Sequence, residues 1–490
     1  MKGTVTDRAR GLGRPGPSVH GGVRLWKVGI QEVARDPFLV LLPVTVFVVG
    51  LLWVAVIPLW QTPDEPAHFS YVQSLGERTS LFPQRFLSRE LVATNELSGM
   101  EGVPGDASVT QPFVPDSDSG PAESKIASLP RELREKVDPS FGNSAAAYPP
   151  GYYLLASLVY RLLSSGDIFS IMFGLRVFSA LLTSITLLFH YLTLRLYFAD
   201  RTTARVTAFL IALSPMYVFM GMAVNVEVLL WLLFSIYLYL LARALREGLS
   251  AKMNLVLAVV VALGLWVKQT FMVGILFYLL LLGFLRLRRS IEWSQLIRAA
   301  LMFSGVVALM AGWLYVSGTA TTSPEVPPGE PSLAGFLAHF VRLWRSYRWA
   351  LQETFWGSFG WLDTPLSQTL YAVLGFVSVS ALAGFLWYIV STKRRKELPD
   401  EAVFFSLVVV LFAGAFVVLN YLVLASGAGW FLQGRYLFPI MAPIMAILVT
   451  GLTWKAPERS KTFLLMGMMG AMVFFHTITL FDYVIPRYYL

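Results

Sequence analysis

Residues 38–70 read FLVLLPVTVFVVGLLWVAVIPLWQTPDEPAHFS, and this stretch changes abruptly from apolar to acidic. It contains no charged residue before Asp64, and about 20 apolar residues are enough for a helix to cross a bilayer. The carboxyl side chains of Asp64 and Glu65 follow directly after this apolar run. The stretch therefore predicts a membrane-spanning helix that emerges from the bilayer at an acidic motif.

The composition of the whole chain supports a membrane protein. Of its 490 residues 56% are hydrophobic and only 14% are charged, and the mean hydropathy is +0.61. A soluble core cannot bury this much apolar surface. The chain has no cysteine, which excludes disulfides, thiolate metal sites and cysteine nucleophiles. The net charge of +9 comes from basic residues at the ends of apolar runs, so we expect no nucleic-acid partner.

The same length criterion predicts about eleven spans and an all-α, polytopic fold. The predicted spans are 37–60, 168–198, 203–222, 226–245, 253–268, 270–286, 296–317, 367–391, 402–425, 434–453 and 462–481. The apolar segment 151–165 is too short to cross, and we expect a helix that lies at the membrane interface or re-enters.

Basic residues give the expected orientation, because short cytoplasmic loops are rich in Lys and Arg. With a cytoplasmic N-terminus and a non-crossing segment 151–165, the inside collects Arg195, Arg201, Arg205, Arg243, Arg246, Lys252, Arg286, Arg288, Arg289, Lys393, Arg394, Arg395, Lys396, Lys455, Arg459 and Lys461. The chain then divides into a basic cytoplasmic segment, 1–36, and a transmembrane domain, 37–490. Loops 61–150 and 318–366 face outward from the cytoplasmic membrane, and the first carries short interfacial helices.

Two interpretations of the acidic pair Asp64 and Glu65 are open. The first is a helix N-cap, because Pro66 marks the first turn of a short helix and carboxylates stabilise that end. The second is a catalytic base, since a partly desolvated carboxylate is a stronger proton acceptor than one in water. If the segment is helical, His68 lies one turn beyond Asp64, as a structural residue or as support for the site.

Further polar residues fall at the outer ends of predicted spans. Lys268 and Arg435 run against the positive-inside bias, and they either snorkel to lipid headgroups or bind an anion. The residues Glu227, Gln269 and Gln433 occur beside them or in another tight outer turn. Several cations at one level, beside an acidic pair, favour a site that binds a lipid-linked phosphate.

Aromatic residues mark both outer loops. Tyr152 opens the segment 151–165, and Trp356 precedes Asp363 in the second loop. Such residues usually anchor a protein at the membrane interface. The other interpretation is a wall for a sugar or isoprenoid pocket, and the sequence leaves both open.

Six segments carry a resemblance to a known family: PDEPAHFSYVQ, YPPGYYLL, SPMYVFMGMAVNVEVL, WVKQTF, FWGSFGWLD and QGRYLFP. In this order they resemble an uncharacterised family of bacterial polytopic membrane proteins, over nearly the whole chain from about residue 37. That family resembles in turn the GT-C glycosyltransferases, which include protein O-mannosyltransferases and lipid A aminoarabinose transferases. The second resemblance rests on architecture and on the acidic motif.

This resemblance implies a polyprenyl-phosphate sugar donor, inverting transfer at the outer face and an acidic base in the first outer loop. Carried onto this chain, the base is Asp64 or else Glu65, and Lys268 and Arg435 hold the donor phosphate. No metal site is transferred, because GT-C enzymes differ in whether they use a divalent cation, and that cofactor stays open.

The leading hypothesis is therefore a membrane glycosyltransferase that acts on a glycan, lipid or protein acceptor. The main alternative is a transporter or flippase of lipid-linked sugars, which would carry charges deep in the bilayer. A polysaccharide polymerase or ligase shares the same kind of donor. The sequence does not identify the sugar or the acceptor.

Overall fold

The computed structural model describes residues 36–78, 85–98, 119–316, 332–342, 345, 348–394, 397–425 and 433–490. The predicted cytoplasmic segment 1–36 lies outside the described residues except for Asp36. Parts of both predicted loops also lie outside them.

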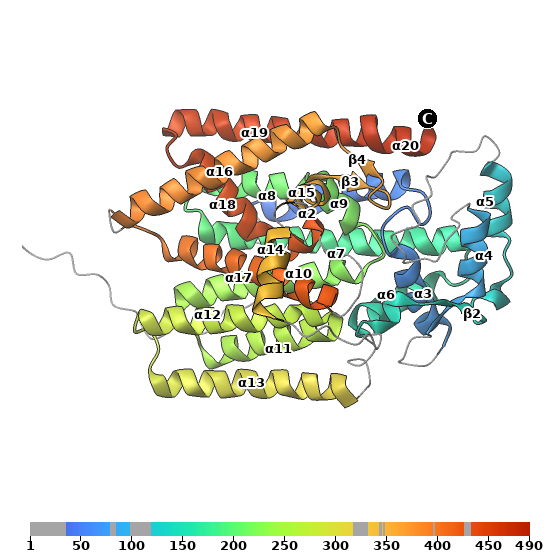
Figure 1. Cartoon of the computed structure of the whole chain (residues 1–490), viewed down its shortest axis with the longest axis horizontal. Helices are drawn as coiled ribbons and strands as arrows, with labels where there is room; N and C mark the ends of the chain where they lie inside the picture. The colour runs from blue at the N-terminus through green and yellow to red at the C-terminus, as the bar shows by residue number, and fades with distance from the viewer. Residues whose placement is uncertain are drawn as a thin grey trace, which may run out of the picture.

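The described chain is a bundle of long apolar helices, so the predicted all-α, polytopic fold class is confirmed (Figure 1). Nine stretches of the described residues are long and apolar enough to span a membrane. They are α2 (Phe38–Val56), α7 (Ile168–Tyr197), α10 (Val226–Glu247), η3 with α12 (Gln269–Leu287), α13 (Trp293–Val316), α16 (Gln368–Arg394), α17 (Asp400–Leu422 of Asp400–Ala425), η5 with α18 (Gly434–Thr453) and α19 with its continuation (Glu458–Tyr489).

Two of the predicted spans differ from this group. The helices α8 (Arg201–Ala212) and α9 (Pro215–Gly221) are bent by 62° at Leu213 and Ser214, where Pro215 cannot continue the hydrogen-bond ladder, and together they make a tenth candidate. The helix α11 (Ala251–Val267) has 17 residues and falls short of the length criterion. A helix therefore occupies each predicted position, but the described chain gives nine or ten candidate spans rather than eleven.

The described residues between α2 and α7 form a separate layer at one end of the bundle, which we call the cap (Figure 1). Its elements are α3 (Glu65–Glu77), β1 (Phe86–Ser88), α4 (Arg89–Leu97), α5 (Ser119–Ala127), η1 (Arg131–Leu133), β2 (Val137–Gly142), η2 (Ser144–Ala147) and α6 (Gly151–Leu163). Strands β1 and β2 pair antiparallel, in a sheet too small to change the fold class. With 13 residues, α6 is about 20 Å long, shorter than the bilayer core.

The second predicted loop region contains α14 (Leu333–Arg342), α15 (Arg348–Trp356) and the short antiparallel pair β3 (Ser358–Phe359) and β4 (Thr364–Pro365). The chain closes with η6 (Thr479–Val484) and α20 (Ile485–Tyr489), toward the same end as the cap (Figure 1). The indole of Trp361 donates a hydrogen bond to the Trp60 carbonyl at 2.8 Å, so this region is joined to the end of α2.

The core and the lipid-facing surface divide along the bundle. Helix α7 packs against α2 and α10, and the apolar window of α10 is 78% buried. In contrast, only 11% of the corresponding windows of α13 and α16 is buried, and Leu309 and Phe376 lie about three-quarters exposed on them. Large apolar side chains on the outer helices suit contact with lipid chains.

The end of the bundle opposite the cap carries basic residues with carboxylate partners. Arg195 and Arg205 both bind Asp36, at 2.6 and 2.8 Å, where α2 begins and α7 ends. Arg246 pairs with Glu401 at 2.6 Å, at the end of α10 and the start of α17. Arg195, Arg205 and Arg246, which belong to the predicted basic clusters, thus lie at one end of the bundle, and the turn that carries Asp64 and Glu65 lies at the other.

Candidate functional site

The turn between α2 and α3, at the start of the cap, carries the acidic pair. Trp60 and Asp64 both have positive φ angles, 62° and 64°, which non-glycine residues rarely adopt. Asp64 occupies the N-cap position of α3, but its side chain makes no capping hydrogen bond. The carboxylate of Asp64 is therefore available for another partner.

Arg435 is that partner, although 371 residues separate it from Asp64. Its Nη2 lies 3.0 Å from Oδ2 of Asp64, and the arginine is 4% exposed whereas Asp64 is 44% exposed. The rest of this guanidinium is poorly satisfied. Nη1 faces the sulfur of Met220 at 3.3 Å, a weak acceptor, and Nε has no hydrogen-bond partner among the described residues.

Glu65 has a different environment from its neighbour. It is fully buried and accepts two hydrogen bonds from Arg176, at 2.9 Å from Nε and 2.6 Å from Nη2. The backbone N–H of Val224 donates to the same carboxylate at 3.2 Å. Arg176 also donates to the carbonyls of Ile57 and Pro58, at 2.5 and 2.9 Å. This pair is a closed structural unit, and it leaves Asp64 as the accessible carboxylate.

Arg176 was missed by the sequence reasoning. It lies within the predicted span 168–198, and an ionisable residue inside a span is by default a candidate for a partner or a role. That signal was present in the sequence, but its partner could not be identified from spacing alone.

The second cation, Lys268, forms an ion pair with Glu227, and both are buried. The ammonium also lies over the rings of Tyr148 and Tyr436, at 5.1 and 5.5 Å from their centroids. The guanidinium of Arg435 lies 5.5 Å from the same Tyr436 ring. The two cations that the sequence singled out, Lys268 and Arg435, thus both lie against the ring of Tyr436.

His68 lies among the charged groups of this site. Its Nδ1 is 2.7 Å from the Tyr153 hydroxyl, and its ring stacks near Tyr148. Burial lowers the pKa of His68 to about 3; the Asp64 carboxylate opposes this shift, and the cations Lys268 and Arg435 add to it. The imidazole is therefore neutral at physiological pH.

Three further residues predicted from the sequence have different surroundings. Tyr152 is fully buried, with its hydroxyl 3.5 Å from Oγ of Ser179. Gln433 begins the segment that carries Arg435, and its Oε1 has no partner among the described residues. Gln269 is exposed at the surface.

Two residues of the second loop region serve other contacts. Trp356 packs against Phe355 and Phe475, 5.1 and 6.4 Å between ring centroids. Asp363 binds Arg487 of α20 at 2.8 Å. Within the described residues, no group of three or more His, Asp or Glu side chains is arranged to hold a metal ion.

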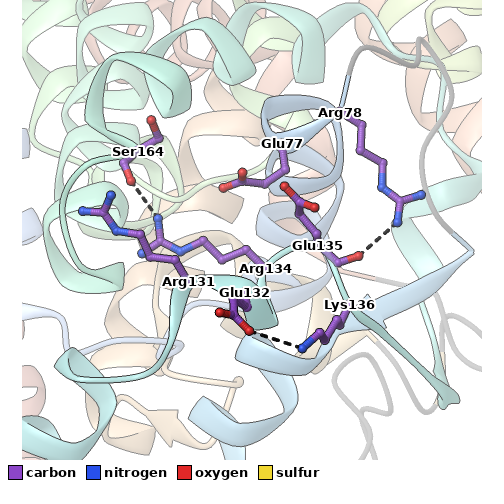
Figure 2. A pocket seen from close by; sticks show the side chains of 8 residues that line it. All are labelled: Glu77, Arg78, Arg131, Glu132, Arg134, Glu135, Lys136 and Ser164. Carbon is purple, nitrogen blue, oxygen red and sulfur yellow. Dashed lines mark hydrogen bonds and ion pairs between the residues drawn. The ribbon is translucent and has the colours of Figure 1, made fainter.

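A pocket of about 650 Å³ lies on the cap (Figure 2). Glu77, Arg78, Arg131, Glu132, Arg134, Glu135, Lys136 and Ser164 line it. Arg134 donates to the Ser164 and Gly166 carbonyls at 2.8 and 2.9 Å, and Arg78 donates to the Glu135 carbonyl at 3.0 Å. Arg134 thus binds two carbonyls at and just beyond the C-terminal end of α6, and none of the predicted site residues lines this pocket.

The model of a family described as "Predicted membrane protein (DUF2142)" matches residues 47–445, which include Asp64, Glu65, Glu227, Lys268 and Arg435. The chain belongs to the DUF2142 family. The family resemblance predicted from the six sequence segments is thereby confirmed. No curated protein matches this DUF2142 chain.

Several solved structures are similar to this DUF2142 protein. One is ArnT from Cupriavidus metallidurans bound to undecaprenyl phosphate, at 14% identity and a TM-score of 0.47, over 89% of this chain and 63% of ArnT. Another is the archaeal oligosaccharyltransferase AglB from Archaeoglobus fulgidus in complex with an inhibitory peptide and a dolichol-phosphate, at 15% identity and a TM-score of 0.47, over 93% and 55%. The DUF2142 chain spans less than two-thirds of the length of either protein.

Proposed function

We propose that this DUF2142 protein is a membrane glycosyltransferase of the GT-C type that takes its sugar from a polyprenyl-phosphate donor. The observation that carries the proposal is the pair formed by Asp64 and Arg435. A half-exposed carboxylate lies beside a buried guanidinium whose Nε has no hydrogen-bond partner among the described residues. A base next to an anion-binding group is what direct transfer from a phosphate-linked sugar requires.

Arg435 supplies the main contact for the donor phosphate. A buried N–H without a partner is costly, and an anion at this position removes that cost. Charge-assisted hydrogen bonds from arginine to phosphate are also among the strong ones. Lys268 contributes less, because Glu227 already neutralises its charge.

Asp64 accepts the proton of the acceptor hydroxyl. The acceptor oxygen attacks the anomeric carbon, the bond from that carbon to the phosphate oxygen breaks, and polyprenyl phosphate leaves with the electron pair. The proton moves from the acceptor to Asp64, and the configuration at the anomeric carbon inverts. Glu65 is unsuited to this role because Arg176 and the Val224 N–H occupy both of its oxygens.

The test of this mechanism is the substitution Asp64→Asn in purified protein in nanodiscs. Undecaprenyl phosphate linked to different hexoses and pentoses serves as the donor, with a cell-envelope extract as the source of acceptor. We expect release of undecaprenyl phosphate to fall by about 10²-fold or more, the scale of losing a general base. Binding of undecaprenyl phosphate itself should be retained.

The control is Glu132→Gln, which removes a carboxylate from a side chain that is 83% exposed on the cap. Its rate should equal that of the parent. An Asp64→Asn variant that releases undecaprenyl phosphate at the parental rate would remove the catalytic role. Movement of the donor across the bilayer without any release would identify the transporter alternative instead.

The proposal also requires the cap to face away from the cytoplasm, as the basic residues at the opposite end favour. The chain has no cysteine, so single introduced cysteines report orientation directly. In intact cells, a membrane-impermeant maleimide should label Glu132→Cys in the cap and should not label Ser460→Cys, which is exposed near the start of α19. The reverse pattern would contradict the proposed location of the reaction.

A further inference from the structure

We infer that Arg176 is a positioning residue for the proposed base Asp64, an inference that rests on the proposed function. Arg176 does not contact Asp64 itself. It acts through the turn between α2 and α3, whose two ends it holds with four hydrogen bonds.

The contacts of Arg176 fall on both sides of this turn. On the α2 side, its Nη1 donates to the carbonyl of Ile57, the C-cap residue of α2, and its Nη2 donates to the carbonyl of Pro58, which also accepts from the Gln61 N–H. On the α3 side, its Nε and Nη2 grip both oxygens of Glu65. Because Glu65 directly follows Asp64, fixing Glu65 also fixes the backbone that aims the Asp64 carboxylate.

The turn needs such a clamp because its backbone is strained. Trp60 and Asp64, both between the clamped ends, adopt left-handed conformations that L-residues with side chains avoid. Conformations of this kind persist only where the surrounding structure enforces them, and they concentrate at functional sites. The left-handed Asp64 is the residue that reaches Arg435 at 3.0 Å.

Arg134 provides a matched control within the same chain. It is also 4% exposed, and it also combines a carboxylate, Glu90 at 2.9 Å, with two carbonyls, of Ser164 and Gly166. It lies in the cap and none of its contacts is in the turn that carries Asp64. Loss of either arginine removes a buried, fully used guanidinium, so both losses should lower the thermal stability.

The experiment compares Arg176→Gln and Arg134→Gln, each alone and in the Asp64→Asn background. The turnover and KM for release of undecaprenyl phosphate, the binding of undecaprenyl phosphate and Tm are measured. We expect Arg176→Gln to lower kcat by about 10-fold to 100-fold, since a misplacement of about 1 Å has effects of this size. Its binding of undecaprenyl phosphate should change by less than about 3-fold, and Arg134→Gln should keep the parental kcat.

The double variant separates positioning from general damage. If Arg176 acts through Asp64, adding Arg176→Gln to Asp64→Asn should cause no further loss of kcat, since the two changes then share one effect. If Arg176→Gln lowers kcat in the Asp64→Asn background by the same factor as in the parent, the inference is overturned. A parental kcat for Arg176→Gln alone would overturn it as well. If Asp64→Asn alone keeps the parental rate, the proposed function itself has failed.

A second substitution covers the case in which Arg176→Gln does not fold. Arg176→Lys keeps the positive charge but cannot grip both oxygens of Glu65 and both carbonyls together. It should fold and should show a smaller loss of kcat with an unchanged KM. A parental kcat in this folded variant would count against positioning.

Discussion

Asp64 and Glu65 are neighbours in the sequence, and each is paired with a buried arginine, but the two pairs are built differently. The Glu65–Arg176 pair is closed: both oxygens of Glu65 and all three nitrogens of Arg176 have hydrogen-bond partners. The Asp64–Arg435 pair is open: one hydrogen bond joins the partners, Asp64 is half-exposed, and Nε of Arg435 has no partner among the described residues.

This difference assigns a structural role to the closed pair and a ligand-binding role to the open pair. A buried ion pair whose hydrogen bonds are complete holds the structure, because removing one partner leaves an uncompensated charge. A buried cation with an unused N–H donor can instead bind an anion that arrives from outside. One arginine therefore fixes the turn, and the other faces the place where the donor phosphate is proposed to bind.

The largest expected effect comes from breaking the closed pair. Glu65→Leu leaves Arg176 buried without its carboxylate, which should cost about 3–5 kcal/mol of unfolding free energy. Asp64→Asn, at a half-exposed position, should cost less than about 1 kcal/mol. Thermal unfolding in the same detergent compares them. Equal losses of Tm would show that the two pairs are structurally equivalent and would remove the distinction.

Removing Arg435 from the open pair should weaken ligand binding more than it lowers stability. Arg435→Gln should weaken the binding of undecaprenyl phosphate by about 1–3 kcal/mol, the value of a lost charge-assisted hydrogen bond, and should change Tm little. Isothermal titration in nanodiscs that lack other anionic lipids measures the affinity.

Lys268→Gln sharpens this prediction because Lys268 has a buried partner. Removing the ammonium of Lys268 leaves the carboxylate of Glu227 unpaired. We therefore expect Lys268→Gln to lower Tm more than Arg435→Gln does, and to weaken the binding of undecaprenyl phosphate less. Unchanged affinity in both variants would mean that these cations do not bind the lipid phosphate.

Much of the fold could be predicted from the sequence, because the length of an apolar run is a local property. The runs at 38–56 and 168–197 needed only counting against the thickness of a bilayer. Where prediction was less accurate, the cause was local as well. Pro215 bends one predicted span, and α11 is a few residues too short.

The site was predicted only in part, because its pairs join distant residues. Unusual placement at the ends of spans singled out Asp64, Glu65, Glu227, Lys268 and Arg435. It could not show that Arg435 pairs with Asp64, that Lys268 pairs with Glu227, or that Arg176 takes Glu65. These partners are set by how the helices pack in three dimensions, which no spacing in one sequence encodes.

The smallest expected effect concerns His68, which lies beside the open pair and is neutral. Its pKa in the folded protein, about 3, is lower than the ordinary value of 6.5, so the unfolded chain takes up a proton as the pH falls through 6.5 while the folded chain does not. The stability that neutral His68 contributes is therefore complete above pH 6.5 and is lost progressively towards pH 3. One pH unit corresponds to about 1.4 kcal/mol, so the unfolding free energy of the parent should fall by about this much between pH 7.5 and 5.5 relative to that of His68→Gln.

Tyr153→Phe is the matched control, because it removes the hydrogen-bond partner of His68 but leaves the imidazole buried, and it should keep the parental acid sensitivity. If Tm of the parent and of His68→Gln decline equally over this range, then His68 exchanges its proton freely in the folded protein, and the surroundings of the open pair are wetter than its burial indicates.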